Sequence, residues 1–496
     1  MIQSNPFPLK GSWPLSGSWL LCLIVSGIAA VLIRMAFTHD SIEWGERYRP
    51  FTGAVTRIMS FMILFTVFLL TMGILFPGVI LPGLTSTADL DLFRMLVPLI
   101  IWHLILWLLI PVLRKHFDPA FCAVCWTLPN IIYFTERSHI SLFDGLIIIP
   151  VPSAFLKTAV LIWLGGFLAV MTYRIISHLR FRKGLLEEST QIREGHVYDL
   201  YLRLLKEHRC QNTYRLYVSK KLNTPLTVGT EDSSTVIILP DRDYTDEQLE
   251  LIFRHELVHI QRQDPFTKFF MSVVCAAGWF IPFVWMTSSR AAQDLELSCD
   301  QTVLKKCNDS QKKEYARLIL SASGDERGYT TCLAADAEDL KYRLREIVKP
   351  ARRRYGTVFI FLFCFLILST YGTVLLAEEC GTLERQIMAW SSEKDADCTV
   401  TSVWADGLYK TVSDTKGLYE CISEKELLRL PANPFYHDNS MPAEAVSYDF
   451  RVHCGNDTFV LNISGRECRI WHMERGSVLF LLKEPLKAED LKPYLE

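Results

Sequence analysis

Long runs of apolar residues constrain this chain more than any other feature of its sequence. Half of the 496 residues are hydrophobic, and the mean hydropathy is +0.19. A helix of about 20 apolar residues crosses the roughly 30 Å hydrocarbon core of a bilayer. Candidate spans cover residues 18–37, 54–82, 95–113, 120–134, 155–176 and 358–376. The pattern predicts a multi-pass α-helical membrane protein.

Basic residues set the expected orientation, because lysine and arginine gather in cytoplasmic loops. Clusters follow the first, third and fifth spans and precede the last one: Arg34, Arg47, Arg49, Arg57, Arg114, Lys115, Arg174, Arg180, Arg182, Lys183, Lys349, Arg352, Arg353 and Arg354. One membrane topology places every basic cluster in the cytoplasm. It has six crossings, both termini outside the cell and the stretch 180–354 in the cytoplasm. No small-residue cleavage site follows the first run, so we interpret it as an anchor.

The runs divide the chain into five predicted parts. These are two N-terminal transmembrane helices (1–93), three further transmembrane segments (94–179), a cytoplasmic domain (180–354), a last transmembrane helix (355–377) and an extracytoplasmic sensor domain (378–496). Short alternating runs separated by turn formers predict an α+β or mostly-β fold for the tail. The tail holds five of the 14 cysteines, and spacing alone leaves their pairing open.

The cytoplasmic part contains the motif H-E-x-x-H at 255–259. Histidines four residues apart lie on one helical face, so both imidazoles can reach one Zn²⁺ while Glu256 faces a water on the metal. Thr245 and Gln248 form a predicted capping box at the start of this helix. We therefore expect His255 and His259 to be metal ligands and Glu256 to be the general base.

A catalytic zinc site uses three protein ligands and leaves one position open. Glu296 and Asp300 share one face of a downstream helix. We expect Glu296 to be the third ligand and Asp300 to accept a hydrogen bond from a ligand histidine. Asp264 is a further candidate for orienting a ligand or the helix end. The alternative is a pair of solvated carboxylates on a surface helix.

The apolar stretch 265–287 follows the motif directly. A full crossing there would separate the two halves of the metal site. We therefore predict a bent hydrophobic hairpin in or against the membrane, with Pro282 at the bend.

These motifs resemble those of a known family. The segments 255–264, 280–285 and 296–300 follow one another as in the integral-membrane gluzincin peptidases related to the β-lactam sensor-transducers, and 223–225 and 236–240 resemble that family's lead-in strand. The resemblance covers roughly 94–377. It implies a bacterial cell-membrane zinc metallopeptidase that an outer sensor switches and that cleaves itself or a cytoplasmic repressor.

The tail departs from the family's penicillin-binding sensor. That sensor is about twice as long and carries S-x-x-K, S-x-N and K-T-G elements. Residues 391–394 match S-x-x-K formally, but Lys410-Thr411-Val412 lacks the glycine. The tail is therefore not expected to be acylated by β-lactams, and its ligand stays unknown. The two N-terminal spans also look like an addition to the family's core.

Substrate contacts are less defined by the sequence. The strand containing Val236 and Ile238 is predicted to hold an extended substrate by edge pairing, and Arg290 is a candidate oxyanion stabiliser. Expected partners are a cytoplasmic protein substrate, membrane lipid and an extracytoplasmic ligand. A homodimer is possible, and no basic-aromatic patch indicates direct nucleic-acid binding.

Two other functions compete with the enzyme. One is a catalytically silent receptor or scaffold with a structural metal site, which the intact set of His255, Glu256, His259 and Glu296 disfavours. The other is a transporter, which would carry ionisable residues or broken helices at mid-membrane. Cys122-x-x-Cys125 and His103 lie in apolar segments, where packing is the simpler role.

Overall fold

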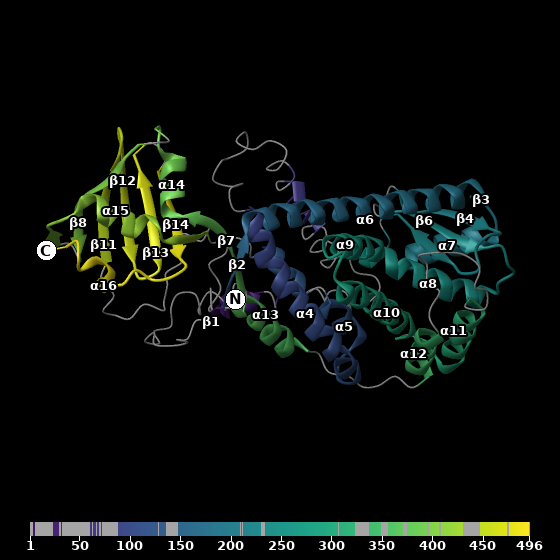
Figure 1. Cartoon of the computed structure of the whole chain (residues 1–496). Coiled ribbons are helices and arrows are strands. Elements are labelled where there is room, and N and C mark those ends of the chain that lie inside the picture. Colours follow the sequence, from purple (N-terminus) through teal and green to yellow (C-terminus); the bar gives the residue numbers. More distant parts are fainter. Residues whose placement is uncertain are drawn as a thin grey trace.

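The computed structural model describes most of the chain from residue 88 onward. The described ranges are 88–126, 128–134, 147–208, 210, 212–229, 234–305, 307–322, 337–348, 356–370, 374–393, 396–405, 408–429, 447–473 and 476–495, with short pieces between residues 3 and 71. The predicted spans 18–37 and 54–82 lie for the most part outside them. A β-sheet occupies one end of the described chain, apolar helices the middle and a mixed α/β unit the other end (Figure 1).

Apolar helices form the middle region. They are α4 (Ala88–His116), α5 (Pro119–Cys125), the 3₁₀ helix η1 (Leu128–Phe134), α6 (Ser153–Glu187) and α13 (Thr357–Thr370). Two stretches are long and apolar enough to cross a membrane, namely Met95–His116 and Ser153–Glu187; Val358–Thr370 is apolar but shorter. They coincide with the third, fifth and last predicted spans.

Two predicted spans need correction. Residues 120–134 do not form one helix, since α5 ends at Cys125 and η1 begins at Leu128. Pro129 accounts for the break, because proline has no N–H to donate to the Cys125 carbonyl four residues earlier and so cannot continue α5. The last span, predicted as 358–376, is also shorter: α13 ends at Thr370 and a strand begins at Val374.

The mixed unit contains a four-stranded sheet in the order β3-β4-β6-β5. Its elements are β3 (Ser189–Ile192), α7 (His196–Glu207), β4 (Arg215–Ser219), β5 (Leu226–Val228), β6 (Val236–Pro240) and α8 (Asp246–Arg262). Tyr201 of α7 and Phe253 of α8 are fully buried with Ile237 of β6 in one apolar cluster. This packing fixes α8, which carries the H-E-x-x-H motif, against the sheet.

Both ends of α8 are defined locally. The Thr245 side chain accepts from the Gln248 amide, and the Gln248 side chain accepts from the Thr245 amide, which confirms the predicted capping box. The helix ends at Arg262, and its C-cap residue Gln263 adopts the left-handed conformation (φ 57°, ψ 37°). The chain therefore turns sharply and enters the next helix at once.

That next helix opens a helical hairpin. It consists of α9 (Asp264–Ala277) and α10 (Pro282–Leu304), and it is followed by α11 (Asp309–Ala322) and α12 (Ala337–Val348). The turn at 278–281 lies just before Pro282, which is the first residue of α10. Trp163 Nε1 of α6 donates to the Ala277 carbonyl at 2.8 Å, and Trp279 Nε1 donates to the Trp163 carbonyl at 3.2 Å. The hairpin is thus joined to α6.

The C-terminal region is an α+β arrangement around a ten-stranded sheet in the order β1-β2-β7-β10-β14-β13-β12-β11-β8-β9. The strands are β1 (Gln3–Ser4), β2 (Ile147–Pro152), β7 (Val374–Thr382), β8 (Cys398–Ala405), β9 (Leu408–Lys410), β10 (Glu426–Arg429), β11 (Ser447–Cys454), β12 (Asp457–Ser464), β13 (Glu467–His472) and β14 (Gly476–Leu482). The helices are α14 (Leu383–Trp390), α15 (Thr415–Ser423) and α16 (Ala488–Leu491).

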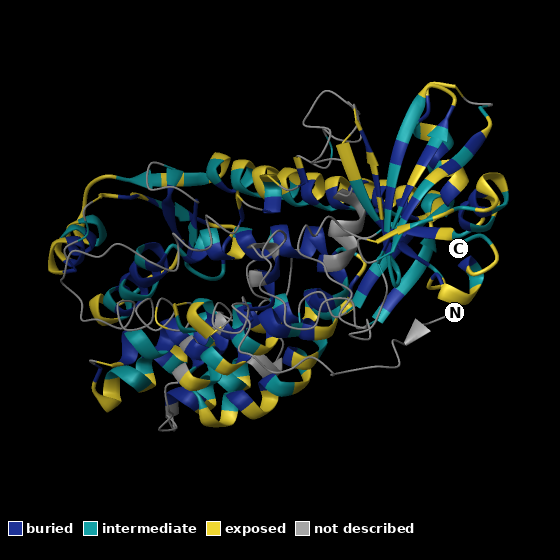
Figure 2. Ribbon diagram, turned by 90° about the vertical axis from the view of Figure 1, so that its left-hand side faces the viewer, coloured by how far each residue is buried: buried dark blue, intermediate teal, exposed yellow. Residues whose placement is uncertain are grey.

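The three helices share one apolar core with one face of this sheet. Along β11 and β12, buried residues alternate with more exposed ones (Figure 2), as expected for strands with only one covered face. Cys398 and Cys454 occupy paired positions on β8 and β11 and form a disulfide. Cys380, Cys421 and Cys468 are free thiols.

Strand β2 joins this sheet to the helical region. It pairs in parallel with β7, with Ile148 opposite Leu375, although the two strands are more than 200 residues apart. The sheet therefore includes a segment that the sequence assigned to the transmembrane part. Helix α6 begins directly after β2 and has 35 residues, so it spans about 52 Å before it reaches β3 in the mixed unit.

Adjacent glycines on α6 give a matched test of this packing. A Cβ at Gly166 would overlap the indole of Trp279, whereas a Cβ at Gly165 would meet nothing within 4 Å. We expect Gly166→Ala to destabilise the protein by about 1–3 kcal/mol through overpacking. Gly165→Ala should be neutral or stabilising, because alanine favours a helix. Thermal unfolding in detergent checks this, and equal unfolding temperatures for the two variants would contradict the packing.

Candidate metal centre

The two histidines of α8 turn the same ring nitrogen toward each other. His255 Nε2 lies 3.0 Å from His259 Nε2, and both side chains are largely buried. The four-residue spacing produces this pairing, because it places both Cβ atoms on one face of the helix. Two imidazole nitrogens at this distance are arranged to bind a common partner.

The other nitrogen of His259 is held by a carboxylate. Asp264 Oδ2 lies 2.6 Å from His259 Nδ1. The left-handed turn at Gln263 makes this contact possible, since it brings the first residue of α9 back against the last turn of α8. Asp264 therefore orients His259, one of the two roles that the sequence left open for it.

His255 is held differently. Its Nδ1 lies 2.7 Å from the Tyr315 hydroxyl, but 3.6 Å from Asp300 Oδ1. The prediction that Asp300 accepts directly from a ligand histidine is therefore wrong, because 3.6 Å exceeds a hydrogen bond. Tyr315 lies between the two groups and also donates to Asp300 Oδ1 at 2.7 Å.

Glu296 of α10 brings a carboxylate to the same point. Its Oε2 lies 3.4 Å from His259 Nε2 and 3.7 Å from His255 Nε2, while Oε1 accepts from Lys268 at 3.0 Å. Arg262 fixes α10 relative to α8, since its guanidinium donates to Ser298 Oγ at 3.1 Å and to Thr302 Oγ1 at 2.6 Å. Both helices thus contribute to one cluster.

The surroundings of the cluster favour a positive charge. Burial alone would lower the pKa of His255, but Cys299 and Glu296 outweigh it and raise the pKa to about 10. Burial would raise the pKa of Glu296, but Lys268 and the two histidines hold it well below its usual value. An ionised carboxylate beside two imidazoles is a suitable environment for a bound cation.

The spacing of the three donors fits zinc. Ligands about 2.1 Å from a tetrahedral metal lie about 3.4 Å from one another, and the three separations here are 3.0, 3.4 and 3.7 Å. Both Nδ1 atoms already have partners, so the Nε2 atoms are the ones left to coordinate. His-His-Glu is also a donor set that zinc enzymes use.

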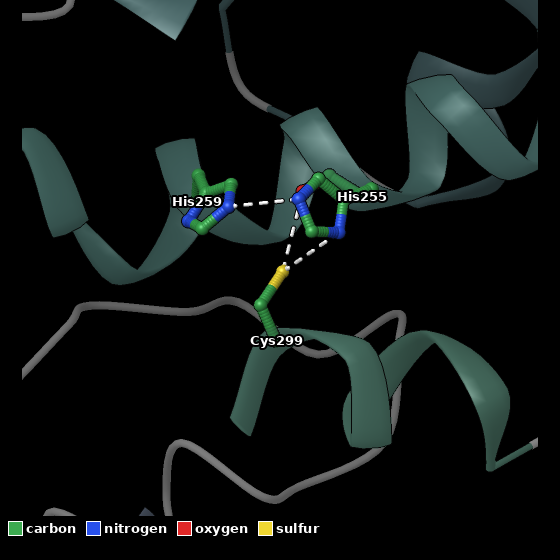
Figure 3. A group of neighbouring side chains, drawn as sticks. All are labelled: His255, His259 and Cys299. Atoms are coloured by element: carbon green, nitrogen blue, oxygen red, sulfur yellow. Dashed lines mark hydrogen bonds between the residues drawn. The ribbon is translucent and has the colours of Figure 1, made fainter. Parts of the chain in front are cut away.

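Cys299 is a second possible donor beside the histidines (Figure 3). Atoms of His255, His259 and Cys299 lie within 4.8 Å of one another. Cys299 Sγ, however, lies 3.4 Å from His255 Nδ1, the nitrogen that does not face His259. Glu296 approaches both Nε2 atoms, and its position therefore suits a third ligand better.

Glu256 lies beside the cluster at the wall of a cavity of about 980 Å³. Its Oε2 accepts from Thr227 Oγ1 at 2.6 Å, and Thr227 belongs to β5. The cavity is also lined by α6 residues from Met171 to Arg182 and by residues 224–229 around β5. It is wide enough for part of a peptide chain.

Comparison with known proteins relates this region to a family. Residues 147–347 match the family described as BlaR1 peptidase M56. The chain is 26% identical over 241 residues to the regulatory protein BlaR1 of Bacillus licheniformis. This aligned segment is 47% of this chain and 38% of that protein. It is 24% identical over 236 residues to the methicillin resistance mecR1 proteins of Staphylococcus aureus and Staphylococcus epidermidis. The chain is related to the β-lactam sensor-transducer family.

This relation covers the whole cluster, since every residue from Thr227 to Arg343 named here lies within the matched segment. The match to a metallopeptidase family and the convergent donors together indicate a metal. The aligned part is limited, because the chain spans 38% of the length of these sensor-transducer relatives. In the comparison with the mecR1 proteins, the aligned segment is 44% of this chain.

The predicted substrate residues need correction. Val236 and Ile238 belong to β6, which has β4 on one side and β5 on the other. It therefore has no free edge, and the edge strand at the cavity is β5. Arg290 is not among the residues that line the cavity, and its carbonyl accepts from Arg114 Nη2 at 3.1 Å. Arg290 is therefore not placed to stabilise an oxyanion.

Sequence analysis missed Thr227, Lys268, Tyr315 and Arg343. Thr227 and Lys268 flank the motif in the chain, but neither belongs to a ligand pattern. Tyr315 and Arg343 are 60 and 88 residues from His255. No local signal identifies them, because the contact of Tyr315 with His255 and the contact of Arg343 with Asp300 depend on how α11 and α12 pack.

Two variants separate the possible third ligands. We expect Glu296→Ala to lower the bound zinc per chain and to weaken zinc affinity by at least tenfold, because a coordinating oxygen is lost. Cys299→Ser should retain zinc. Elemental analysis after dialysis, with a competing chelator for affinity, measures both. Loss of zinc from the cysteine variant alone would assign the site to Cys299.

Proposed function

We propose that this chain is a membrane-embedded zinc endopeptidase that acts as a signal transducer. In this proposal His255, His259 and Glu296 hold the metal, and Glu256 is the general base. The main observation behind this proposal is that the Nε2 atoms of the two histidines and Oε2 of Glu296 lie within 3.7 Å of one another. They do so beside Glu256, at the wall of a large cavity. The relation to a peptidase family supports the same function.

The chemistry divides between the metal and the chain. Bound zinc supplies Lewis acidity, which acidifies water at an open position and polarises a carbonyl. Glu256 takes the proton from the attacking water and returns it to the leaving amine. Thr227 Oγ1 donates to Glu256 Oε2, and in this proposal the other oxygen, Oε1, exchanges the proton. The Thr227 contact also fixes the carboxylate relative to the substrate edge.

The substrate in this proposal is an extended protein segment. Strand β5 pairs on one side with β6, and its other side lies at an end of the described sheet. Residues 224–229 line the cavity, so a peptide added to this edge would pass the metal donors. The implied target is the chain itself or a cytoplasmic repressor, as the resemblance to the sensor-transducers suggests.

Exposed apolar side chains support a membrane location. On α4 they recur every three or four residues at Ile101, Ile105, Leu108 and Val112, which forms one stripe. Similar residues are exposed on α6 and α13, including Phe155, Leu161, Ile162, Leu168, Val358, Leu362 and Leu366. A lipid partner accounts for so much exposed apolar surface. The basic clusters then orient the metal centre toward the cytoplasm.

The sheet of β7–β14 is the proposed extracytoplasmic sensor. Strand β2 belongs to this sheet and leads directly into α6. The far half of α6, from Met171 to Arg182, lines the cavity that contains the metal donors. A ligand that shifts the sheet would therefore move a wall of the peptidase site through one continuous helix.

Glu256→Gln tests the enzymatic proposal. We expect this variant to keep zinc but to lose at least about 10³-fold in cleavage, because the amide cannot take the proton from water. Glu247→Gln, on an exposed first turn of the same helix, is the matched control. Cleavage of a co-expressed cytoplasmic repressor and of the chain itself is followed by immunoblot.

Wild-type cleavage rates in Glu256→Gln would contradict the general-base assignment. Zinc binding without any cleavage in the wild-type protein under inducing conditions would favour the alternative, a silent receptor with a structural metal.

A further inference from the structure

The two histidines of the cluster are held by different kinds of partner. His259 has a carboxylate, Asp264, directly on its Nδ1. His255 has instead the hydroxyl of Tyr315, which reaches it from α11. The difference matters because a hydroxyl can either donate or accept, so it does not by itself decide where the imidazole proton lies.

Asp300 removes this ambiguity. The Tyr315 hydroxyl lies 2.7 Å from Asp300 Oδ1, and an ionised carboxylate only accepts hydrogen bonds. Tyr315 must therefore use its one proton on Asp300. Its oxygen can then only accept from His255 Nδ1, so the neutral imidazole, the form that coordinates a metal, carries its proton on Nδ1. The lone pair is consequently on Nε2, which faces His259 and Glu296.

Arg343 of α12 donates to both oxygens of Asp300, so this carboxylate acts as an acceptor. Its Nε lies 2.7 Å from Asp300 Oδ2 and its Nη2 lies 2.8 Å from Oδ1. This is a bidentate guanidinium–carboxylate pair, which is strong and directional. Asp300 is fully buried, so the pair is shielded from water. The contacts run without a gap from Arg343 through Asp300 and Tyr315 to His255.

We propose that Tyr315 is a positioning residue that selects the metal-binding tautomer of His255. The proposal rests on the proposed metal centre but concerns a residue outside its motifs. It follows that metal affinity depends on the packing of α11 and α12 against α8 and α10. A phenylalanine would fill the same space in the apolar cluster with Cys299 and Val303, so the hydroxyl alone carries the proposed role.

Tyr315→Phe in the full-length protein is the direct test. We expect about 10–100-fold weaker zinc binding, the usual effect of losing a partner of a ligand histidine. Tyr217→Phe, on β4 and outside the cavity, is the matched control and should bind zinc as the wild type does. Cobalt-substituted protein gives a second readout, since the visible bands should shift in Tyr315→Phe alone.

The outcomes separate the two proposals. Unchanged zinc affinity and cobalt bands in Tyr315→Phe, with zinc bound by the wild type, would overturn the positioning role only. Absence of zinc binding by the wild type would overturn the metal centre itself. A lower unfolding temperature of the metal-free variant without a change in affinity would mark Tyr315 as structural and would also overturn the proposal.

Arg343→Lys gives an independent second variant. Lysine keeps the charge but cannot make the bidentate pair. We expect an intermediate loss of zinc affinity, between wild type and Tyr315→Phe. An affinity equal to the wild type would separate Arg343 from the histidine and would contradict the continuous chain of contacts.

Discussion

The structure depends on the close approach of two imidazoles on one helix. At 3.0 Å, His255 Nε2 and His259 Nε2 can share one proton in a hydrogen bond or coordinate a common cation. Either arrangement requires that each ring is held in place through its other nitrogen. Asp264 and Tyr315 provide that hold. Each comes from a different element, so the cluster forms only when α8, α9 and α11 are packed together. The geometry of the candidate site therefore depends directly on the fold of the mixed unit.

A second constraint joins the two ends of the molecule. The strand pair β2–β7 places the start of α6 within the C-terminal sheet, and the far half of the same helix lines the cavity. A helix is stiff over this length because its backbone hydrogen bonds run without interruption, so displacement at one end reaches the other. The indoles of Trp163 and Trp279 tie the middle of α6 to the α9–α10 hairpin. The C-terminal sheet and the unit that contains the candidate metal centre are consequently linked through packing as well as through the chain.

Local rules recovered the parts of the site that local sequence encodes. The capping box at Thr245 and the shared face of His255 and His259 follow from helix geometry alone. A motif with two histidines needs a third ligand, which predicts Glu296, and the structure places its carboxylate 3.4 Å from His259 Nε2. Asp300 was placed near the right group but assigned the wrong contact. The error arose because the intervening hydroxyl belongs to a helix that no local pattern connects to the motif.

The sequence by itself determined the helical character of 95–113 and 155–176, the alternation of the tail strands, and the helix faces that present His255, His259 and Glu296. These features depend on residues within a few turns of one another. Only the tertiary structure decided that β6 is interior while β5 forms the edge, and that β2 joins a sheet built mostly from the far end of the chain. It also decided that Tyr315 contacts His255 and that Arg343 pairs with Asp300. Strand order and long-range side-chain contacts are set by how whole surfaces pack. Residue periodicity predicts which face of an element is buried, but it does not predict which other element packs against that face.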